Sequence, residues 1–505
     1  MRRLLLTTAA GAALSTLIAT PAFADTLREA LLKAYQSNPT LTGERASLRA
    51  NDENVPIARS SGLPTVNGTS SYNESIYNSN GGNGPPRQAQ VGASLNVPIY
   101  SGGSVRNSVR AAETRVDAGR ANLRGVESGL FTDVVSVYND VIRDESIVRL
   151  NQQNVHVLEV NLQATRDRFE VGDLTRTDVA QSEARLAIAQ GQLRTAESRL
   201  VSSRENYIRV VGAAPGTLEV PPPLPNLPAD PQSAVTTAID ENPVLLAAQK
   251  QRDATRFDVD VAKSGRMPRV GVSVGPSYNT YLGSVGNSAA AAGFRNSGFG
   301  VTGGLNLTLP LFQAGRVSAQ VRQAEARRSA AFEGVTEAER GVIAQTRSAF
   351  ANWKSSQHVI ESSEVAVSAN KLSLEGVRAE NSVGTRTILD ILNAEQELLN
   401  SQVTLVTARR DAYVAGFALL AAMGQAEASD LNLEGGPLYD PTVNYNRVRH
   451  KIGDWGSDGE PQPVATRTND TPAQTPDVAP DRTSGDPALQ PAVDSSPRNP
   501  PTNPR

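Results

Sequence analysis

Two stretches of the chain alternate between apolar and polar residues with a period of two. One runs from Val91 to Ile99 and the other from Val301 to Leu311, each with Val, Ala, Leu or Ile on one side and mainly Gly, Ser, Thr or Asn on the other. This alternation predicts β-strands with one apolar face. A length of about ten residues suits a tilted strand that crosses a bilayer, although a strand of a soluble sandwich gives the same pattern.

Each alternating stretch is preceded by a second strand-like run across a loop rich in Gly, Ser and Asn. Gly and Asn tolerate the backbone conformations that tight loops require. Tyr and Phe residues cluster in or beside these segments. Such a cluster is typical of the aromatic girdles of membrane barrels, but Tyr and Phe are also common in ordinary strands. We therefore expect four strands, at about 64–77, 88–101, 268–282 and 298–312.

A segment with almost no helix breakers follows each pair of strands, at about 103–169 and about 315–381. At 1.5 Å per residue each would form a helix of roughly 100 Å, longer than an ordinary globular domain holds. Val-Gly pairs then reverse the chain, and helices return at about 174–212 and 386–423. Apolar residues spaced by sevens on the return helices predict knobs-into-holes packing against neighbouring helices.

These elements form one unit that is written twice. Asn38-Pro39 matches Asn242-Pro243 at an offset of 204 residues, whereas later motifs match at an offset of 212, so an eight-residue insertion lies in the second strand loop. We expect repeats at 25–220 and 221–430. Each begins with a short helix (about 26–37, about 231–241) that ends at Asn-Pro, followed by a second helix at about 40–61 or 244–265.

The two ends of the chain differ from the repeats. Residues 1–24 combine two arginines, an apolar run and a small-x-small ending, which predicts an export signal peptide with a lone membrane anchor as the alternative. Residues 431–505 form a C-terminal extension, in which 11 of the 45 residues from Pro461 onward are proline, so we predict disorder from about 461. Residues 425–460 are assigned to no element.

Composition narrows the function classes. The chain has 505 residues with 49 basic and 52 acidic side chains, a formal charge of −3, which argues against a nucleic-acid partner. It has no cysteine and three histidines at unrelated repeat positions, so thiol chemistry, disulfides and credible metal sites are lacking. We predict no enzymatic activity, no cofactor and no metal. Mature residues contain no run of 18 apolar residues, so any membrane crossing must use strands.

The whole constellation resembles the TolC family of outer-membrane efflux proteins over about residues 25 to 430. The most specific stretch runs from Val383 to Leu392 and looks like the family's second hairpin tip and following helix. The resemblance implies an α+β membrane protein in which three protomers share a 12-stranded β-barrel, four strands each, continued by a 12-helix α-barrel of coiled-coil helices. Four strands alone cannot close around a lumen, so oligomerisation is required on physical grounds as well.

The resemblance also implies location, function and partners. The chain would be a homotrimer in contact with outer-membrane lipid, with a long helical tunnel in the periplasm. It would serve as the passive exit duct of a tripartite efflux or type I secretion system, together with a periplasmic adaptor (membrane fusion) protein and a proton-driven or ABC-type inner-membrane pump. Small drugs and polypeptides both remain open as cargo. The alternative is a structural or adhesive coiled-coil surface protein that conducts nothing.

Specific residues follow from the resemblance by position. Asp390 would form a carboxylate ring at the tunnel entrance, and Arg386, Asp178 and Thr177 would form a latch that holds the entrance shut. An Asp near a helix N-terminus is favourable through the helix dipole alone, which is the plainer explanation for Asp178. Asn393 and Asn381 replace a second entrance carboxylate and a latch tyrosine, so we expect a single ring and a weaker latch.

The hairpin tips would contact the adaptor. The residues concerned are Val171, Gly172, Val383, Gly384 and Thr385. Glycine at these positions also has a plain structural explanation, because a chain reversal requires a left-handed backbone conformation. Both explanations are compatible.

Overall fold

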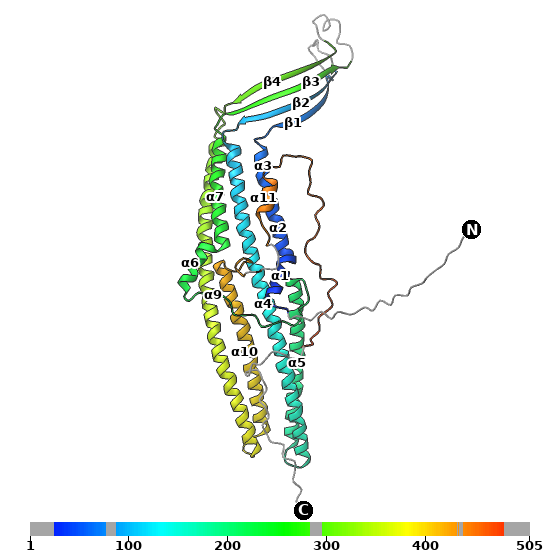
Figure 1. The fold of residues 1–505 in the computed structure, drawn as a ribbon, viewed down its shortest axis with the longest axis vertical. Coiled ribbons are helices and arrows are strands. Elements are labelled where there is room, and N and C mark those ends of the chain that lie inside the picture. The colour runs from blue at the N-terminus through cyan, green and yellow to red at the C-terminus, as the bar shows by residue number, and fades with distance from the viewer. Residues whose placement is uncertain (1–24, 77–86, 283–294, 432, 434–437, 479–505) are drawn as a thin grey trace, which may run out of the picture.

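The computed structural model describes residues 25–76, 87–282, 295–431, 433 and 438–478. The expected signal peptide and the tips of both strand loops lie outside the described residues. The molecule is elongated, with a sheet at one end and two helical hairpins at the other (Figure 1). Within the described ranges, no helix is long and apolar enough to span a membrane.

The sheet has four antiparallel strands in the order β1-β2-β3-β4. They are β1 (Thr65–Glu74), β2 (Arg87–Tyr100), β3 (Arg269–Tyr281) and β4 (Ser297–Thr308), close to the four predicted runs. β4 ends before its predicted limit at 312, because Pro310 has no backbone N–H to give to the ladder. The two later helices of the first repeat and the first two helices of the second lie between β2 and β3 in sequence, yet the two strands pair directly.

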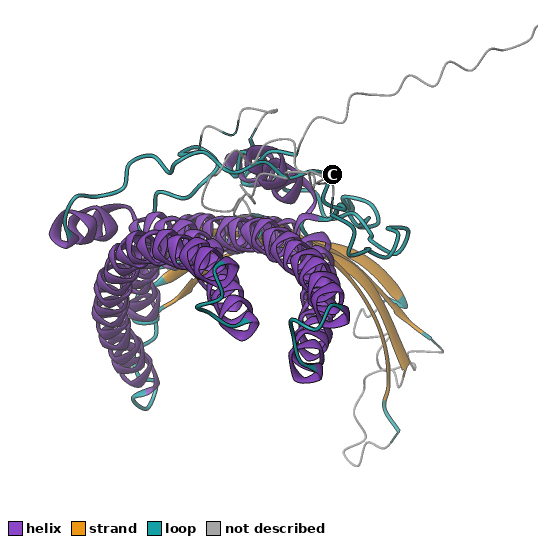
Figure 2. Cartoon of the chain, turned by 90° about the horizontal axis from the view of Figure 1, so that it is seen from below, coloured by secondary structure: helices purple, strands orange, loops and turns teal. Residues whose placement is uncertain are grey.

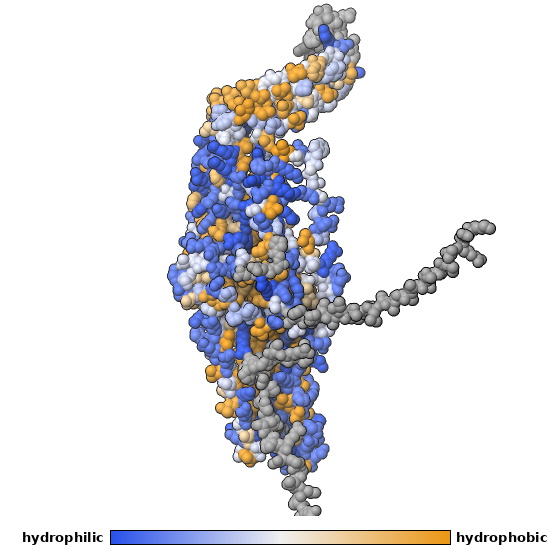
Figure 3. Space-filling view, viewed as in Figure 1, coloured by the Kyte–Doolittle hydropathy of each residue, from blue (hydrophilic) through white to orange (hydrophobic). Residues whose placement is uncertain are grey.

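Apolar side chains on the sheet have no protein cover. They are exposed on both outer strands and on β2, and they dominate the sheet in the space-filling view (Figure 3). Examples are Val66, Val91, Phe299, Val301, Leu305 and Leu307. Among the described residues β1 and β4 each have one ladder partner, so each leaves one edge open. Such a sheet requires apolar surroundings and further strands at its edges.

The helices repeat the same order in both halves. The first half holds α1 (Leu27–Ser37), α2 (Pro39–Asp52), α3 (Asn54–Ser60), α4 (Ser104–Glu170) and α5 (Arg176–Val211). The second half holds α6 (Pro231–Glu241), α7 (Pro243–Ser264), α9 (Arg316–Ser382) and α10 (Ile388–Met423), and α11 (Thr442–Val448) follows. The long helices α4 and α9 have 67 residues each. Seen along the molecule, the helices form an arc with the short helices on its convex side (Figure 2).

One predicted helix is wrong. The single helix expected at about 40–61 is divided at Glu53 into α2 and α3. Proline removes a backbone N–H and disrupts a continuous helix, and Pro56 lies four residues after Asp52, whose carbonyl it cannot bond. α7 at the equivalent place in the second repeat has no internal proline and is continuous.

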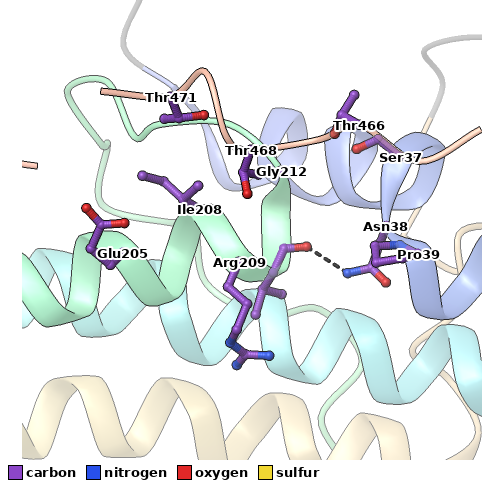
Figure 4. A pocket seen from close by; sticks show the side chains of 11 residues that line it. Ser37, Asn38, Pro39, Glu205, Ile208, Arg209, Gly212, Thr466, Thr468 and Thr471 are labelled. Carbon is purple, nitrogen blue, oxygen red and sulfur yellow. Dashed lines mark hydrogen bonds between the residues drawn. The ribbon is translucent and has the colours of Figure 1, made fainter. Parts of the chain in front are cut away.

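The Asn-Pro motifs join the end of each repeat to its beginning, which we call closing the repeat. The side-chain oxygens of Asn38 and Asn242 each cap the helix that follows. Each accepts a hydrogen bond from the backbone N–H two residues later, at 2.8 Å for Asn38 and 2.9 Å for Asn242. Each side-chain amide also donates to the last turn of the return helix. Asn38 donates to the carbonyl of Val210 at 2.8 Å (Figure 4), and Asn242 donates to the carbonyl of Ala422 at 2.8 Å. Both asparagines are buried, so each fixes where a return helix ends against the start of its own repeat.

The C-terminal segment contacts the helices on both sides of an exposed stretch at 451–464. Tyr439 donates its backbone N–H to the Tyr35 hydroxyl at 2.9 Å, and α11 follows beside α2. Residues 461–478 run without helix or strand and contact α5, where Gln474 N–H donates to Glu205 at 3.1 Å. The disorder predicted from about 461 stays a prediction. Residues 479–505 lie outside the described residues.

We expect Asn242→Ala and Asn38→Ala each to lower the stability of the protein by about 1–3 kcal/mol, because each change leaves a buried carbonyl and a helix N–H without a partner. The measurement is the midpoint of helix loss on heating purified protein in detergent. Asn352→Ala, at an exposed position of α9, is the control and should leave the midpoint unchanged or slightly higher. Equal midpoints for all three variants would contradict the closing role of the Asn-Pro motifs.

Candidate functional site at the hairpin tips

Both hairpin turns are built on a glycine in the left-handed region. Gly172 has φ of +88° and Gly384 has φ of +80°, and an added side chain would meet nothing within 4 Å at either position. The constraint is therefore the backbone conformation and not space. Each turn closes the preceding helix in the same way, with Asp173 N–H bonded to the Arg168 carbonyl at 2.9 Å in the first hairpin. Next to the glycines, Val171 and Val383 are exposed at the ends of the hairpins.

Asp178 and Asp390 both complete a capping box at the start of a return helix. In the second hairpin the Thr387 N–H and hydroxyl donate to the Asp390 carboxylate at 2.9 and 2.7 Å, and Asp390 N–H donates back to the hydroxyl at 3.3 Å. Thr175 and Asp178 make the same three bonds in the first hairpin. The local sequence Thr-x-x-Asp explains both, because it satisfies free N–H groups of the first turn.

These hydrogen bonds favour the ionised carboxylates. The bonds from the side chain and then the backbone of Thr387 lower the pKa of Asp390, with a smaller contribution from Arg386. The pKa of Asp178 is also lowered, first by the backbone and then by the hydroxyl of Thr175. Both side chains therefore carry a negative charge at the hairpin end at neutral pH.

The latch residues named from the sequence are not joined to one another within one protomer. Arg386 pairs with Glu380 on the same hairpin at 2.8 Å and approaches Asp390 at 4.0 Å. Among the described residues, no hydrogen bond or ion pair links Arg386 to Asp178 or Thr177. The latch role of these three residues therefore stays a prediction.

A different set of side chains joins the two hairpins. Glu395 on α10 is buried and accepts two bonds from the Asn161 amide on α4, at 2.9 and 3.1 Å. Arg378 on α9 donates to the same carboxylate at 3.2 Å. One carboxylate thus connects three helices of both hairpins.

Two further contacts complete this inter-hairpin seam, which we define as Asn161, Arg185, Arg378, Leu392, Asn393 and Glu395. Leu392 on α10 is buried against Val155, Leu158 and Ala189 of the first hairpin. Arg185 on α5 donates to the Asn393 side-chain oxygen at 2.6 Å. Asn393, which replaces an expected second entrance carboxylate, therefore has a defined partner on the other hairpin.

The duplication shows how the seam differs from its counterpart. The pair Arg378 and Glu395 corresponds at the offset of 212 to Arg166 and Glu183, which pair at 2.7 Å. In the first hairpin the two side chains are 50% and 49% exposed, whereas Glu395 is 4% exposed. The same ion pair is thus a surface feature on one hairpin and a buried junction on the other.

Sequence reasoning missed Glu395. Its position lies in the apolar stripe of α10, between Ile391 and Leu398, where a charged residue is unusual. That irregularity was the available signal. Burial raises the pKa of Glu395, while the hydrogen bonds from Asn161 and Arg378 partly oppose the rise.

With this geometry established, comparison with known proteins identifies the family. The family model described as outer membrane efflux protein matches residues 30–213 and 234–425, which cover most of both repeats. The chain belongs to this family.

Relatives and solved structures agree. The chain is 33% identical to outer membrane efflux protein BepC of Brucella suis biovar 1 (strain 1330) over 439 residues, 85% of this chain and 92% of BepC. It is 27% identical to outer membrane protein TolC of Escherichia coli (strain K12) over 460 residues, 87% of this chain and 93% of TolC. The solved Campylobacter jejuni CmeC outer membrane channel has a TM-score of 0.69 at 16% identity, covering 84% of this chain and 89% of CmeC.

The predictions of family, location and general function are thereby confirmed, as is the fold class of the single chain with its four strands and long paired helices. The protein is an outer-membrane exit channel for efflux or secretion, with a helical tunnel in the periplasm. The alternative of a non-conducting surface protein is set aside. The described four-stranded sheet and paired long hairpins are the single-chain part of that channel architecture.

We expect Glu395→Ala to destabilise the protein by about 3–5 kcal/mol, because it leaves the Arg378 guanidinium and the Asn161 amide without their buried partner. Glu183→Ala removes the matched exposed pair, whose contribution is about 0–1 kcal/mol. Thermal midpoints of both variants, measured together in detergent, provide the comparison. Equal midpoints would show that the buried pair is not an energetic junction.

The raised pKa of Glu395 determines how the stability of the protein changes with pH. The folded protein binds the Glu395 proton more readily than the unfolded chain, so this group favours the folded state at low pH and loses that contribution as pH rises through its raised pKa. Glu395→Gln keeps hydrogen-bond acceptance and should remove this part of the pH dependence. A variant whose stability falls with pH as the wild type's does would contradict the assignment.

Proposed function

We propose that the protein is a passive duct without catalysis of its own, which assembles as a homotrimer and opens at the hairpin end when it docks to a periplasmic adaptor and an inner-membrane pump. The observation that supports this best is the inter-hairpin seam, a largely polar junction close to the hairpin ends. Further from the tips the two helical pairs also contact each other, for example through Arg410 on α10 and Asp140 on α4 at 2.9 Å. Neither the class of pump nor the cargo is part of the proposal.

The trimer follows from the sheet. Four strands leave two open edges, and about eight strands are the minimum even for a barrel filled by side chains. Three copies would supply 12 strands, each β4 pairing with the β1 of the next copy, and every backbone group would then be satisfied in hydrocarbon. The curved arc of helices in one chain suits one third of a ring (Figure 2).

The seam suits a gate because it can be broken without unfolding either hairpin. Moving the α9–α10 hairpin outward from α4–α5 would separate Asn161 from Glu395 and Arg185 from Asn393, and would uncover Leu392. Each helix would keep its own capping box and turn. Contacts further from the tips, such as Arg410 with Asp140, can stay in place while the tips separate. The movement then breaks only the few contacts of the seam, a cost on the scale that docking a partner can supply.

The hairpin tips suit a docking surface. Val171 and Val383 present apolar side chains beside glycines whose surroundings are open, so another helical hairpin can approach the backbone closely. Thr385 is held in the turn, because its hydroxyl donates to the Glu380 carbonyl at 2.9 Å. The tips are therefore preformed, which lowers the entropic cost of docking.

Asp390→Asn is expected to lower the preference for cations over anions in planar bilayers, because it removes one charge from each protomer at the entrance while asparagine can still accept the cap bonds. Asp178→Asn removes the same charge from the matching capping box of the first hairpin. This control should leave ion selectivity unchanged. Equal selectivity of both variants and wild type would argue against an Asp390 ring.

Arg386→Ala is expected to raise the mean conductance of the resting channel, since it removes the cation that pairs with Glu380 and Asp390 at the entrance. Single-channel recording measures the change. The same recording of Glu395→Ala tests the seam separately, and Glu183→Ala is its matched control. Unchanged conductance in both Arg386→Ala and Glu395→Ala would contradict gating at this end of the tunnel.

Docking is tested by single cysteines, which the natural chain lacks. Val383→Cys and Val171→Cys at the tips should form crosslinks to the periplasmic adaptor in intact cells. Val443→Cys on α11, also exposed, is the control and should not. Crosslinking at Val443 alone would place the adaptor away from the hairpin tips.

A further inference from the structure

A turn at residues 449–458 lies where the helices give way to the sheet. Arg59 in the last turn of α3 donates to the Arg449 carbonyl at 3.3 Å and also contacts the His450 ring. α3 ends at Ser60 and β1 begins at Thr65, so the start of this turn is fixed just below the strands. The ribbon shows the segment after α11 beside α3, beneath the sheet (Figure 1).

The turn is closed by charged side chains. The Arg447 guanidinium forms two hydrogen bonds with the Asp458 carboxylate, at 2.8 and 2.7 Å. Lys451 Nζ lies 3.8 Å from the same carboxylate, and its side chain passes close to Gly456. Because Arg447 lowers the pKa of Asp458 to about 2, the bridge stays charged at neutral pH. The two ends of the turn are therefore held together.

The apolar residues of this closed turn point outward. Trp455 is fully exposed and Ile452 is 76% exposed. The other tryptophan of the chain, Trp353, instead packs edge-on against Phe350 with ring centroids 5.7 Å apart. Tryptophan with an exposed indole beside cationic side chains is characteristic of residues that sit at the headgroup level of a membrane.

The position of the turn suits phospholipid better than the tunnel interior. The short helices and the C-terminal segment lie on the convex side of the helical arc, away from the concave side (Figure 2). At the same level, the strand ends expose Ile99, Tyr100, Leu311 and Phe312. In an outer-membrane channel with a periplasmic tunnel, the outer surface at this level meets the periplasmic leaflet.

We propose that the turn at 449–458 is a membrane anchor, in which Trp455 and Ile452 enter the headgroup layer of the periplasmic leaflet while Arg449 and Lys451 contact lipid phosphates. The anchor would extend the apolar belt of the sheet with a segment from outside the duplicated repeats. It would also hold the C-terminal segment at a fixed level against the outer face of the tunnel.

The test uses the fluorescence of Trp455 in the full-length channel. Trp353→Phe leaves Trp455 as the only tryptophan. This variant is reconstituted in vesicles of phosphatidylethanolamine and phosphatidylglycerol that contain phosphatidylcholine brominated near the headgroup. We expect its emission to be quenched and blue-shifted relative to indole in water. Trp455→Phe retains Trp353, which lies about 55 Å along α9 from the strands and should not be quenched.

Two other outcomes would overturn the anchor. Emission that is quenched by iodide and unaffected by brominated lipid would mean that Trp455 faces water. Blue-shifted emission that neither quencher reaches would place Trp455 against protein, such as a neighbouring protomer. Asp458→Asn, which weakens the closing bridge without altering Trp455, should reduce lipid quenching; full quenching in that variant would show that the bridge does not position the indole.

Discussion

The uncovered sheet is the constraint on which the rest of the architecture depends. Its apolar side chains are exposed, and β1 and β4 each lack a second ladder partner in the described chain. In hydrocarbon an unpaired strand edge is costly, and the proposed closure of the sheet with copies of itself would remove both edges. Because each long helix follows a strand after only a short connection, closing the sheet would also arrange the helices in a ring. The tunnel below the membrane would thus follow from the way the backbone N–H and C=O groups of the edge strands find hydrogen-bond partners within the membrane.

Because the repeat is duplicated, each chain has two helical hairpins. The two hairpins are built in the same way but lie in different environments. Both turn at a glycine with positive φ, and both return helices start with a Thr-x-x-Asp capping box. The difference lies at one pair: Arg166 and Glu183 remain in solvent, whereas Glu395 is enclosed between helices. A surface ion pair adds little stability, but a buried carboxylate must keep its partners. The second hairpin is therefore bound to its neighbour, while the first is not bound through the equivalent residues.

Periodicity predicted the long elements well and the junctions poorly. The strands, the long helices and the hairpin glycines follow from patterns within ten to seventy residues of sequence, and the bounds agree to within a few residues. The break at Glu53 follows from Pro56, which has no counterpart in the second repeat, so the duplicated pattern alone predicts a single helix there. Asn161 and Glu395 are 234 positions apart, so no local pattern could pair them. The resemblance supplied Asp390 and Arg386, yet it could not show that Arg386 bonds Glu380 within its own hairpin.

Asp390 and Glu395 on α10 have opposite electrostatic settings, and this limits how the gate can work. Thr387 holds Asp390 ionised, since its hydrogen bonds lower the pKa of that carboxyl. A charge stabilised by its own helix cap does not depend on a neighbouring protomer or on docking. Opening by neutralising this charge is therefore disfavoured, and displacement of the whole hairpin is the simpler route. Glu395 has the opposite bias, because burial favours its neutral form and only the bonds from Asn161 and Arg378 oppose it. Separating the hairpins would break the hydrogen bond from Asn161 and at the same time expose the Glu395 carboxylate to water. The favourable hydration of that carboxylate would offset part of the free energy that opening requires.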